Sequence, residues 1–118
     1  MHILSWNVNG LRSCARKGYL DWLGDCGADI VALQEVRALP EQLDDEVRAP
    51  KKWHTYFSPA ERKGYSGVGL YSRRAIDHMD TLLGKEEFDC EGRVQIATIG
   101  KLLIANVYFP NGSGKNRD

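Results

Sequence analysis

Short apolar runs alternate with polar, glycine-containing segments along the chain, a pattern typical of short strands separated by turns and helices. Two runs, DIVAL and LLIANVY, are almost continuously apolar, as expected for strands that are covered on both faces. The predicted strands are Ile3–Trp6, Ile30–Leu33, Trp53–Phe57, Gly67–Ser72, Arg93–Ile99 and Leu102–Tyr108. The pattern therefore predicts an α/β fold.

The segment between the first two predicted strands has the spacing of an amphipathic helix. The residues with this spacing are Tyr19, Leu20, Trp22, Leu23 and Cys26. Gly24 or Gly27 can end the helix, which gives a strand–helix–strand unit. A second short helix is predicted in LPEQLDDEVRAP, with Pro40 at its start and acidic residues in its first turns. ATIGKLLIA predicts a hairpin that turns at Gly100–Lys101.

The composition narrows the class of protein. The chain has 118 residues, 42% of them hydrophobic, and a formal net charge of zero. This length fits one domain, and the charge argues against a strongly basic nucleic-acid-binding coat. The N-terminus does not resemble a signal peptide, and no apolar run is as long as a membrane span. We therefore expect an intracellular protein without a membrane partner. The three cysteines lack CxxC spacing, so free thiols are expected rather than a metal site.

Three of the predicted strands end in polar side chains that could bind a ligand. The first strand is followed by Asn7 and Asn9, and the DIVAL strand by Gln34 and Glu35. In open α/β sheets, ligands bind at the carboxyl ends of strands. The last strand ends at Tyr108, with Asn111 in the next turn. The polar residues at the three strand ends come together if the three strands are neighbours. Carboxylate and amide oxygens are hard ligands that suit Mg²⁺ or Mn²⁺.

Structural interpretations of the same residues remain open. Asn-Gly and Pro-Asn-Gly are ordinary turn sequences, and a glutamate after an apolar strand is commonly the first solvated residue. Basic side chains near the strand ends form either a solvated surface or a rim that follows phosphates. These basic residues are Arg12, Arg16, Lys17, Arg37, Lys115 and Arg117.

Taken together, the motifs resemble a known family. LSWNVNGLR, LDWL, DIVALQE, KGYSGVGLYSR, CEGR and NVYFPNG occur in the order found in exonuclease III-type AP endonucleases, within the endonuclease/exonuclease/phosphatase superfamily. The resemblance extends from Met1 to about Gly114. It implies part of a four-layered, DNase I-like α/β sandwich, in which two packed sheets, one of them mixed, are flanked by helices. Residues 1–118 would form the N-terminal portion of such a domain.

The resemblance also implies an activity. Members cleave DNA on the 5′ side of abasic sites with Mg²⁺, for which Mn²⁺ can substitute, and many also trim 3′ ends as 3′–5′ exonucleases or 3′-phosphatases. The implied partner is double-stranded DNA with abasic sites or 3′ blocks. By this resemblance the complete protein is a monomeric hydrolase of base excision repair. We expect it in the cytoplasm, or in the nucleus of a eukaryote, and not outside the cell.

Site residues are carried over by matching positions. Glu35 resembles the metal-binding glutamate, and Asn7 the amide that supports the metal. Tyr108 resembles the phenol that contacts the scissile phosphate, and Asn111 matches the family's asparagine after that strand. Asn9 stands where some relatives have an aspartate. The residues that resemble DNA contacts are Arg12, Lys17, Tyr65 and Arg93, of which Arg93 could instead form a structural ion pair.

The chain departs from the family pattern in one respect. The Asp-x-Asn segment and the late Asp–His pair of the family do not occur before Asp118. We therefore expect that the 118-residue chain alone is inactive. Two alternatives remain open. One is a truncated, non-catalytic fragment with at most weak DNA binding, and the other is a superfamily phosphatase that acts on small phosphoesters.

Overall fold

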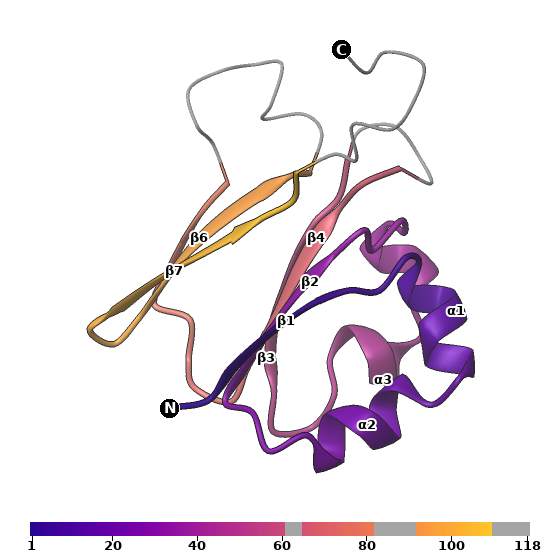
Figure 1. The fold of residues 1–118 in the computed structure, drawn as a ribbon, viewed down its shortest axis with the longest axis horizontal. Helices are drawn as coiled ribbons and strands as arrows, with labels where there is room; N and C mark the ends of the chain where they lie inside the picture. Colours follow the sequence, from indigo (N-terminus) through magenta and orange to yellow (C-terminus); the bar gives the residue numbers. More distant parts are fainter. Residues whose placement is uncertain (61–64, 82–91, 110–118) are drawn as a thin grey trace.

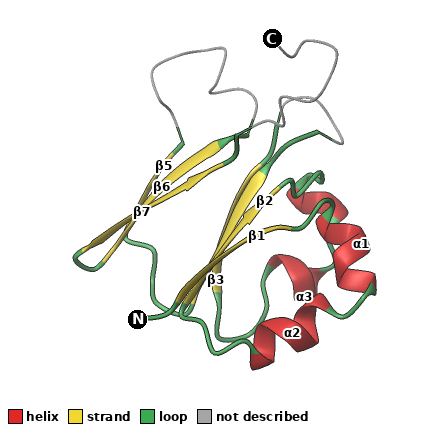
Figure 2. Ribbon diagram, in the orientation of Figure 1, coloured by secondary structure: helices red, strands yellow, loops and turns green. Residues whose placement is uncertain are grey.

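A computed structural model describes residues 1–60, 65–81 and 92–109, which form three layers (Figure 1). Helices cover one face of a four-stranded sheet, and a three-stranded sheet packs against its other face (Figure 2). The helical segments are α1 (Leu11–Arg16), α2 (Tyr19–Asp25), the 3-10 turn η1 (Pro40–Gln42) and α3 (Asp45–Arg48). The strands are β1 (Ile3–Asn7), β2 (Ile30–Gln34), β3 (His54–Ser58), β4 (Val68–Ser72), β5 (His78–Asp80), β6 (Val94–Ile99) and β7 (Leu102–Val107).

The four-stranded sheet is mixed, with the strand order β1-β2-β4-β3. β1 and β2 run parallel from Ile3↔Ile30 to Asn7↔Gln34, and α1 and α2 lie on the connection between them. This arrangement confirms the predicted strand–helix–strand unit. β4 runs antiparallel to both β2 and β3, while the three-stranded sheet, β5-β6-β7, is antiparallel throughout.

The helices and the four-stranded sheet enclose an apolar core rich in aromatic rings. Leu11, Tyr19 and Leu23 from the helices pack against Leu33 and other residues of the sheet. Tyr71 lies near the centre of this core, where its hydroxyl donates a hydrogen bond to the carbonyl oxygen of Val47. Burial raises the pKa of the Tyr19 and Tyr71 phenols above their ordinary value, because a buried phenolate would lose its hydration. We call this layer the helix-side core.

The two sheets meet in a smaller apolar cluster. Its buried members are Ile30, Ala32, Leu70, Ala97 and Ile99. Because side chains alternate along a strand, β2 sends Val31 and Leu33 into the helix-side core and Ile30 and Ala32 toward the other sheet. The prediction that DIVAL forms a strand covered on both faces is therefore confirmed.

The same prediction is wrong for the first half of β7. The predicted hairpin is present, with Ile99 paired to Leu102 and Gly100 at φ +60° in the turn. Beyond this turn, β7 is the outer strand of its sheet, and Leu103 is 72% exposed. LLIANVY is almost continuously apolar, although only one face of this strand lies against the other sheet within the described residues.

Three other elements differ from the sequence prediction. α1 was not predicted, because a helix of six residues with one fully buried side chain, Leu11, has too little periodicity to be recognised. The predicted helix in LPEQLDDEVRAP consists of η1 and α3, separated by extended backbone at Leu43 and Asp44. This break lets both Leu43 and Val47 reach the core. The three-residue strand β5 was also missed. No helix in the described ranges is long and apolar enough to cross a membrane.

Candidate functional site

The carboxyl ends of three strands meet at one edge of the molecule, as the sequence predicted. Asn7 pairs with Gln34 at the ends of β1 and β2. Across the two sheets, Gln34 Nε2 donates a hydrogen bond of 2.9 Å to Asn106 Oδ1, near the end of β7. Beyond these positions lie Glu35, after β2, and Tyr108, after β7. We call this edge, with Asn7, Glu35 and Tyr108, the rim; it lies at the end of the sheets opposite α2 in Figure 1.

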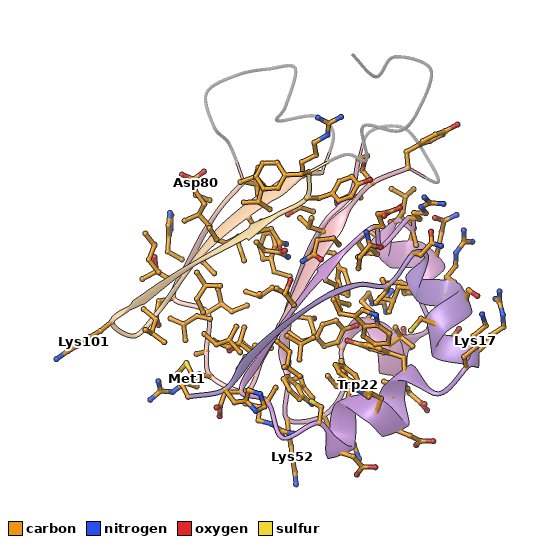
Figure 3. All side chains as sticks on the ribbon, in the orientation of Figure 1. Met1, Lys17, Trp22, Lys52, Asp80 and Lys101 are labelled. Atoms are coloured by element: carbon orange, nitrogen blue, oxygen red, sulfur yellow. The ribbon has the colours of Figure 1, made fainter. Side chains whose placement is uncertain are left out.

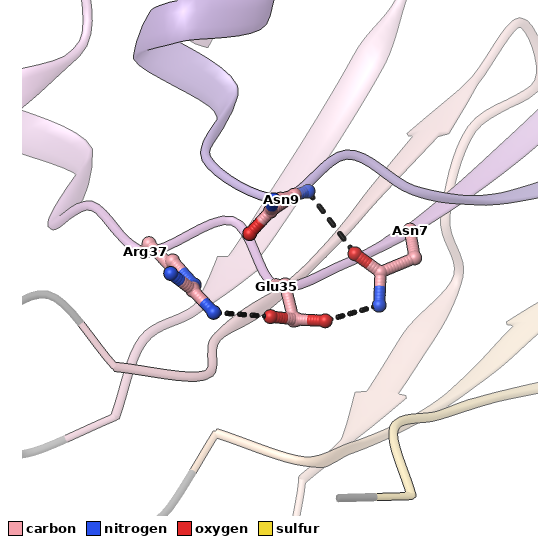
Figure 4. A network of polar contacts seen from close by, with 4 residues as sticks. All are labelled: Asn7, Asn9, Glu35 and Arg37. Atoms are coloured by element: carbon pink, nitrogen blue, oxygen red, sulfur yellow. Dashed lines mark hydrogen bonds and ion pairs between the residues drawn. The ribbon is translucent and has the colours of Figure 1, made fainter. Parts of the chain in front are cut away.

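Glu35 is held by two donors at the rim (Figure 4). Asn7 Nδ2 donates a hydrogen bond to Glu35 Oε2, and Arg37 forms an ion pair of 2.6 Å with Glu35 Oε1. Asn7 is oriented in turn by the backbone N–H of Asn9, which donates to Asn7 Oδ1 at 3.0 Å. The Glu35 side chain is only 15% exposed, so the carboxylate has a restricted orientation.

The backbone at the site is locally strained. Asn9, Glu35 and Arg37 have φ angles of +48°, +53° and +55°, in the left-handed region that non-glycine residues rarely adopt. Such conformations cost about 1–3 kcal/mol each and persist only where the surrounding structure imposes them. Their clustering around one carboxylate points to a functional site.

Backbone hydrogen bonds impose this conformation from two sides. On one side, the N–H groups of Gly10 and Leu11 donate to the carbonyl oxygens of Glu35 and Val36, at 2.8 and 2.9 Å. On the other side, the N–H of Val36 donates to Gly67 O at 2.9 Å, and that of Arg37 to Ser66 O at 2.8 Å. The Glu35 segment is thus clamped between the α1 turn and the turn before β4.

The donor set at the rim fits a hard divalent cation. An ionised carboxylate offers about four acceptor positions, and Asn7 and Arg37 each occupy one at Glu35. A carboxylate with few further protein ligands suits Mg²⁺, which keeps several of its waters. In the described ranges, no three His, Cys, Asp or Glu side chains cluster as a metal-binding group. In this structure the Asn7 amide N–H donates a hydrogen bond to Glu35. Asn7 therefore contacts the candidate cation site through the Glu35 carboxylate.

Tyr108 and Arg93 lie together at the rim. The backbone N–H of Tyr108 donates to Arg93 O at 2.7 Å, which extends the β6–β7 pairing by one step. Gly92, the glycine of the EGR motif, has φ +59° and lies against β3. A Cβ at Gly92 would come within 2.6 Å of Ser58 O, so this glycine is required by close packing. The Arg93 side chain is half-buried, and its role remains a prediction.

The other predicted DNA contacts are spread over a wider surface. Tyr65 is 54% exposed and lies in the turn before β4. The next residue in this turn, Ser66, accepts the backbone hydrogen bond from Arg37. Arg12 is exposed in the first turn of α1, close to the clamp. Lys17 lies at the opposite end of α1, away from the rim (Figure 3). Asn111 lies outside the described residues.

Sequence reasoning missed two buried amides and the specific role of a third residue. Asn106 and Gln95 are buried between the sheets and linked to Gln34 by hydrogen bonds. The available signal was an amide within a predicted strand, at a position followed or preceded two residues away by an apolar residue, Ala97 for Gln95 and Ile104 for Asn106. Arg37 was expected only as one of several basic residues near the strand ends, and its ion pair with Glu35 depends on the φ angle described above.

Comparison with known proteins identifies the family. The model of the endonuclease/exonuclease/phosphatase family matches residues 4–116. The chain belongs to this family. An exodeoxyribonuclease of Bacillus subtilis is 38% identical over 94% of the chain and 43% of its own length. The DNA repair nuclease APEX1 of Danio rerio is 37% identical over 96% of the chain and 37% of its own length.

A solved structure gives the same result for the fold. The AP endonuclease from Archaeoglobus fulgidus superposes with a TM-score of 0.79 at 28% identity, over 95% of this chain and 42% of its own. The expected DNase I-like architecture is therefore confirmed. The chain spans less than half the length of each of these three proteins.

Proposed function

We propose that the chain carries one wall of the active site of a DNA-repair nuclease that uses Mg²⁺, or Mn²⁺ in its place. The observation that carries the proposal is the Glu35 carboxylate, held by Asn7 and Arg37 on a strained segment at the rim. Tyr108 follows the neighbouring β7 at the same edge. The proposed reaction is phosphodiester hydrolysis on the 5′ side of abasic sites in duplex DNA, with trimming of 3′ ends.

Family membership supports DNA as the substrate class. Two relatives bear the names exodeoxyribonuclease and DNA repair nuclease, and a structural neighbour is an AP endonuclease. Nothing at the rim favours a small phosphoester over DNA. The exposed Tyr65 and Arg12 on either side of the Glu35 clamp provide an aromatic surface and a cation for a polynucleotide backbone.

The side chains at the rim have distinct proposed roles. Glu35 would hold the cation, and Asn7 would keep the carboxylate in the required orientation. Bound there, a divalent cation supplies charge neutralisation at the phosphate and the leaving oxygen. The Tyr108 hydroxyl would donate a hydrogen bond to a phosphate oxygen, while Arg12 and Lys17 would contact the DNA backbone.

The test is cleavage of a labelled duplex that contains one abasic-site analogue, with Mg²⁺ and with EDTA. In a full-length protein that contains this chain, we expect a Mg²⁺-dependent nick that is lost in Glu35→Gln, because this change removes the charge and preserves the shape. Asp25→Asn is the matched control, since Asp25 is an exposed carboxylate at the end of α2 remote from the rim. Equal cleavage by the full-length Glu35→Gln variant and by the unaltered full-length protein would contradict the proposal.

A second candidate is binding of abasic DNA without cleavage. It is favoured by the length comparison, because each relative has more than half of its chain outside the matched region. Fluorescence anisotropy with the same duplex separates the two candidates. Binding that weakens with salt, without any nick, would support the second candidate; turnover of an inositol phosphate in place of DNA would contradict both.

A further inference from the structure

Three amide side chains, two of them buried and one half-buried, form a hydrogen-bonded chain between the two sheets. The chain runs from Gln34 on β2 through Asn106 on β7 to Gln95 on β6, and we call it the amide bridge. At its far end, Gln95 Nε2 donates to Tyr56 O at 2.9 Å and to Ser58 Oγ at 3.1 Å. The amide bridge is therefore anchored in both sheets, in the interface that also contains the apolar cluster of Ile30, Ala32, Leu70, Ala97 and Ile99.

Asn106 is the central member and is only 2% exposed. Its Oδ1 accepts the hydrogen bond from Gln34, and its Nδ2 lies within hydrogen-bond distance of Leu33 O at 3.2 Å and Gly69 O at 3.0 Å. Nδ2 also contacts Gln95 Oε1 at 3.1 Å. A buried amide with this many partners has one orientation, because any other would leave buried polar groups unpaired.

The position of Asn106 connects the two segments that meet at the rim. Its contacts on β2 are Leu33 and Gln34, the two residues directly before Glu35. Tyr108 follows Asn106 by two residues, and side-chain alternation directs both toward the same side of β7. Asn106 therefore fixes how far the Glu35 segment lies from the Tyr108 segment.

We propose that Asn106 is a positioning residue for the site at the rim. It orients the Glu35 carboxylate through Leu33 and Gln34 and sets its place relative to Tyr108. The metal-binding part of this inference rests on the proposed function, in which Glu35 holds the cation. Outer partners of metal ligands act in this way, and their loss commonly reduces metal affinity by about 10–100-fold.

The test compares Asn106→Leu with Gln95→Leu. Both changes replace a buried amide of the same interface with leucine. Among the described residues Gln95 makes no hydrogen bond to β2, whereas Asn106 makes two. The first readout is the NMR signal of the Glu35 carboxyl carbon in the labelled full chain, together with the thermal midpoint. The second is Mn²⁺ affinity, measured by electron paramagnetic resonance.

We expect Asn106→Leu to shift the Glu35 signal and to weaken Mn²⁺ binding about tenfold, with Gln95→Leu remaining within about twofold of the unaltered chain. Both variants should lower the thermal midpoint, so stability alone does not separate them. Equal effects of the two variants on Glu35 and on Mn²⁺ would overturn the proposal, because Asn106 would then be a packing residue only.

A second variant covers the case in which Asn106→Leu does not fold. Gln34→Leu breaks the same hydrogen bond from β2, and we expect it to shift the Glu35 signal in the same direction; an unchanged signal would overturn the proposal. The proposed function can fail separately. If Glu35→Gln leaves Mn²⁺ affinity unchanged, Glu35 is not a metal ligand and the proposed function fails. The Glu35 NMR signal in Asn106→Leu still decides whether Asn106 positions this carboxylate.

Discussion

The two faces of β2 are built from different chemistry. One face contributes Val31 and Leu33 to the helix-side core, which is apolar and rich in aromatic rings. The other contributes Ile30 and Ala32 to a small cluster and ends at Gln34, in the amide bridge. The helix-side core supplies most of the buried apolar surface and therefore most of the stability, while the sheet-to-sheet face supplies directional contacts that orient the rim.

This division predicts that stability and site geometry can be changed separately. Changes in the helix-side core should alter the free energy of unfolding and leave cation binding by the folded chain unaffected. Changes of exposed side chains at the rim, such as Arg37, should alter cation binding and leave the free energy of unfolding nearly unaffected.

Leu23→Ala should lower the free energy of unfolding by about 3 kcal/mol, because it leaves a cavity in the helix-side core. Leu23 lies on α2 with 1% exposure. Urea denaturation followed by circular dichroism measures the loss. Mn²⁺ affinity, measured where the variant is still folded, should match that of the unaltered chain; a parallel loss of affinity would show that the two faces are coupled.

Alkaline pH should destabilise the chain through the helix-side core. Burial raises the pKa of Tyr19 and Tyr71 above their ordinary value of 10.0, so the unfolded chain releases these protons first. The stabilisation is complete below about pH 10 and is lost above it, by about 1.4 kcal/mol per pH unit for each phenol. Tyr71→Phe should remove one of these contributions. Urea midpoints across this pH range provide the measurement, and an unchanged pH slope in Tyr71→Phe would contradict the assignment.

Arg37→Met should strengthen Mn²⁺ binding about fivefold, which corresponds to about 1 kcal/mol for a partly exposed ion pair. The Arg37 guanidinium, 46% exposed, occupies one oxygen of Glu35 and competes there with a cation. Arg48→Met is the control, because Arg48 forms its ion pair with Asp45 within α3. Weaker binding by Arg37→Met would show that Arg37 supports the cation site and does not compete with it.

Gly24→Ala should stabilise the chain by about 0.5 kcal/mol without changing Mn²⁺ affinity. Gly24 lies inside α2, and a Cβ at this position would meet no atom within 4 Å. Alanine restricts the unfolded chain and favours the helix. Thermal unfolding measures the gain, and a lower midpoint would indicate that the α2 backbone requires glycine.

Local patterns in the sequence were sufficient to predict several elements. The apolar run of β2, the helical spacing around Trp22 and the turn at Gly100 depend on neighbouring residues, and each is present. α1 is too short to show periodicity, and the break between η1 and α3 depends on where Leu43 meets the core. The exposure of Leu103 depends on its position at the edge of a sheet, which no local pattern specifies.

Local sequence patterns also predicted only part of the candidate site. Three polar strand ends were predicted to converge from the general behaviour of α/β sheets, and Asn7, Glu35 and Tyr108 do lie at one edge. The amide bridge was not predicted, because Gln34 and Asn106 are 72 residues apart in the chain. The ion pair of Arg37 depends on a left-handed φ angle, which its residue type does not favour.

The separation of Gln34 and Asn106 along the chain has a kinetic consequence. The β6–β7 hairpin closes through a short turn at Gly100, so it can form early from local contacts. The hydrogen bond from Gln34 to Asn106 requires both sheets to be in place and closes a far longer loop. We therefore expect the rim to be completed in the last step of folding, so that a partly folded chain would have formed strands but no organised cation site.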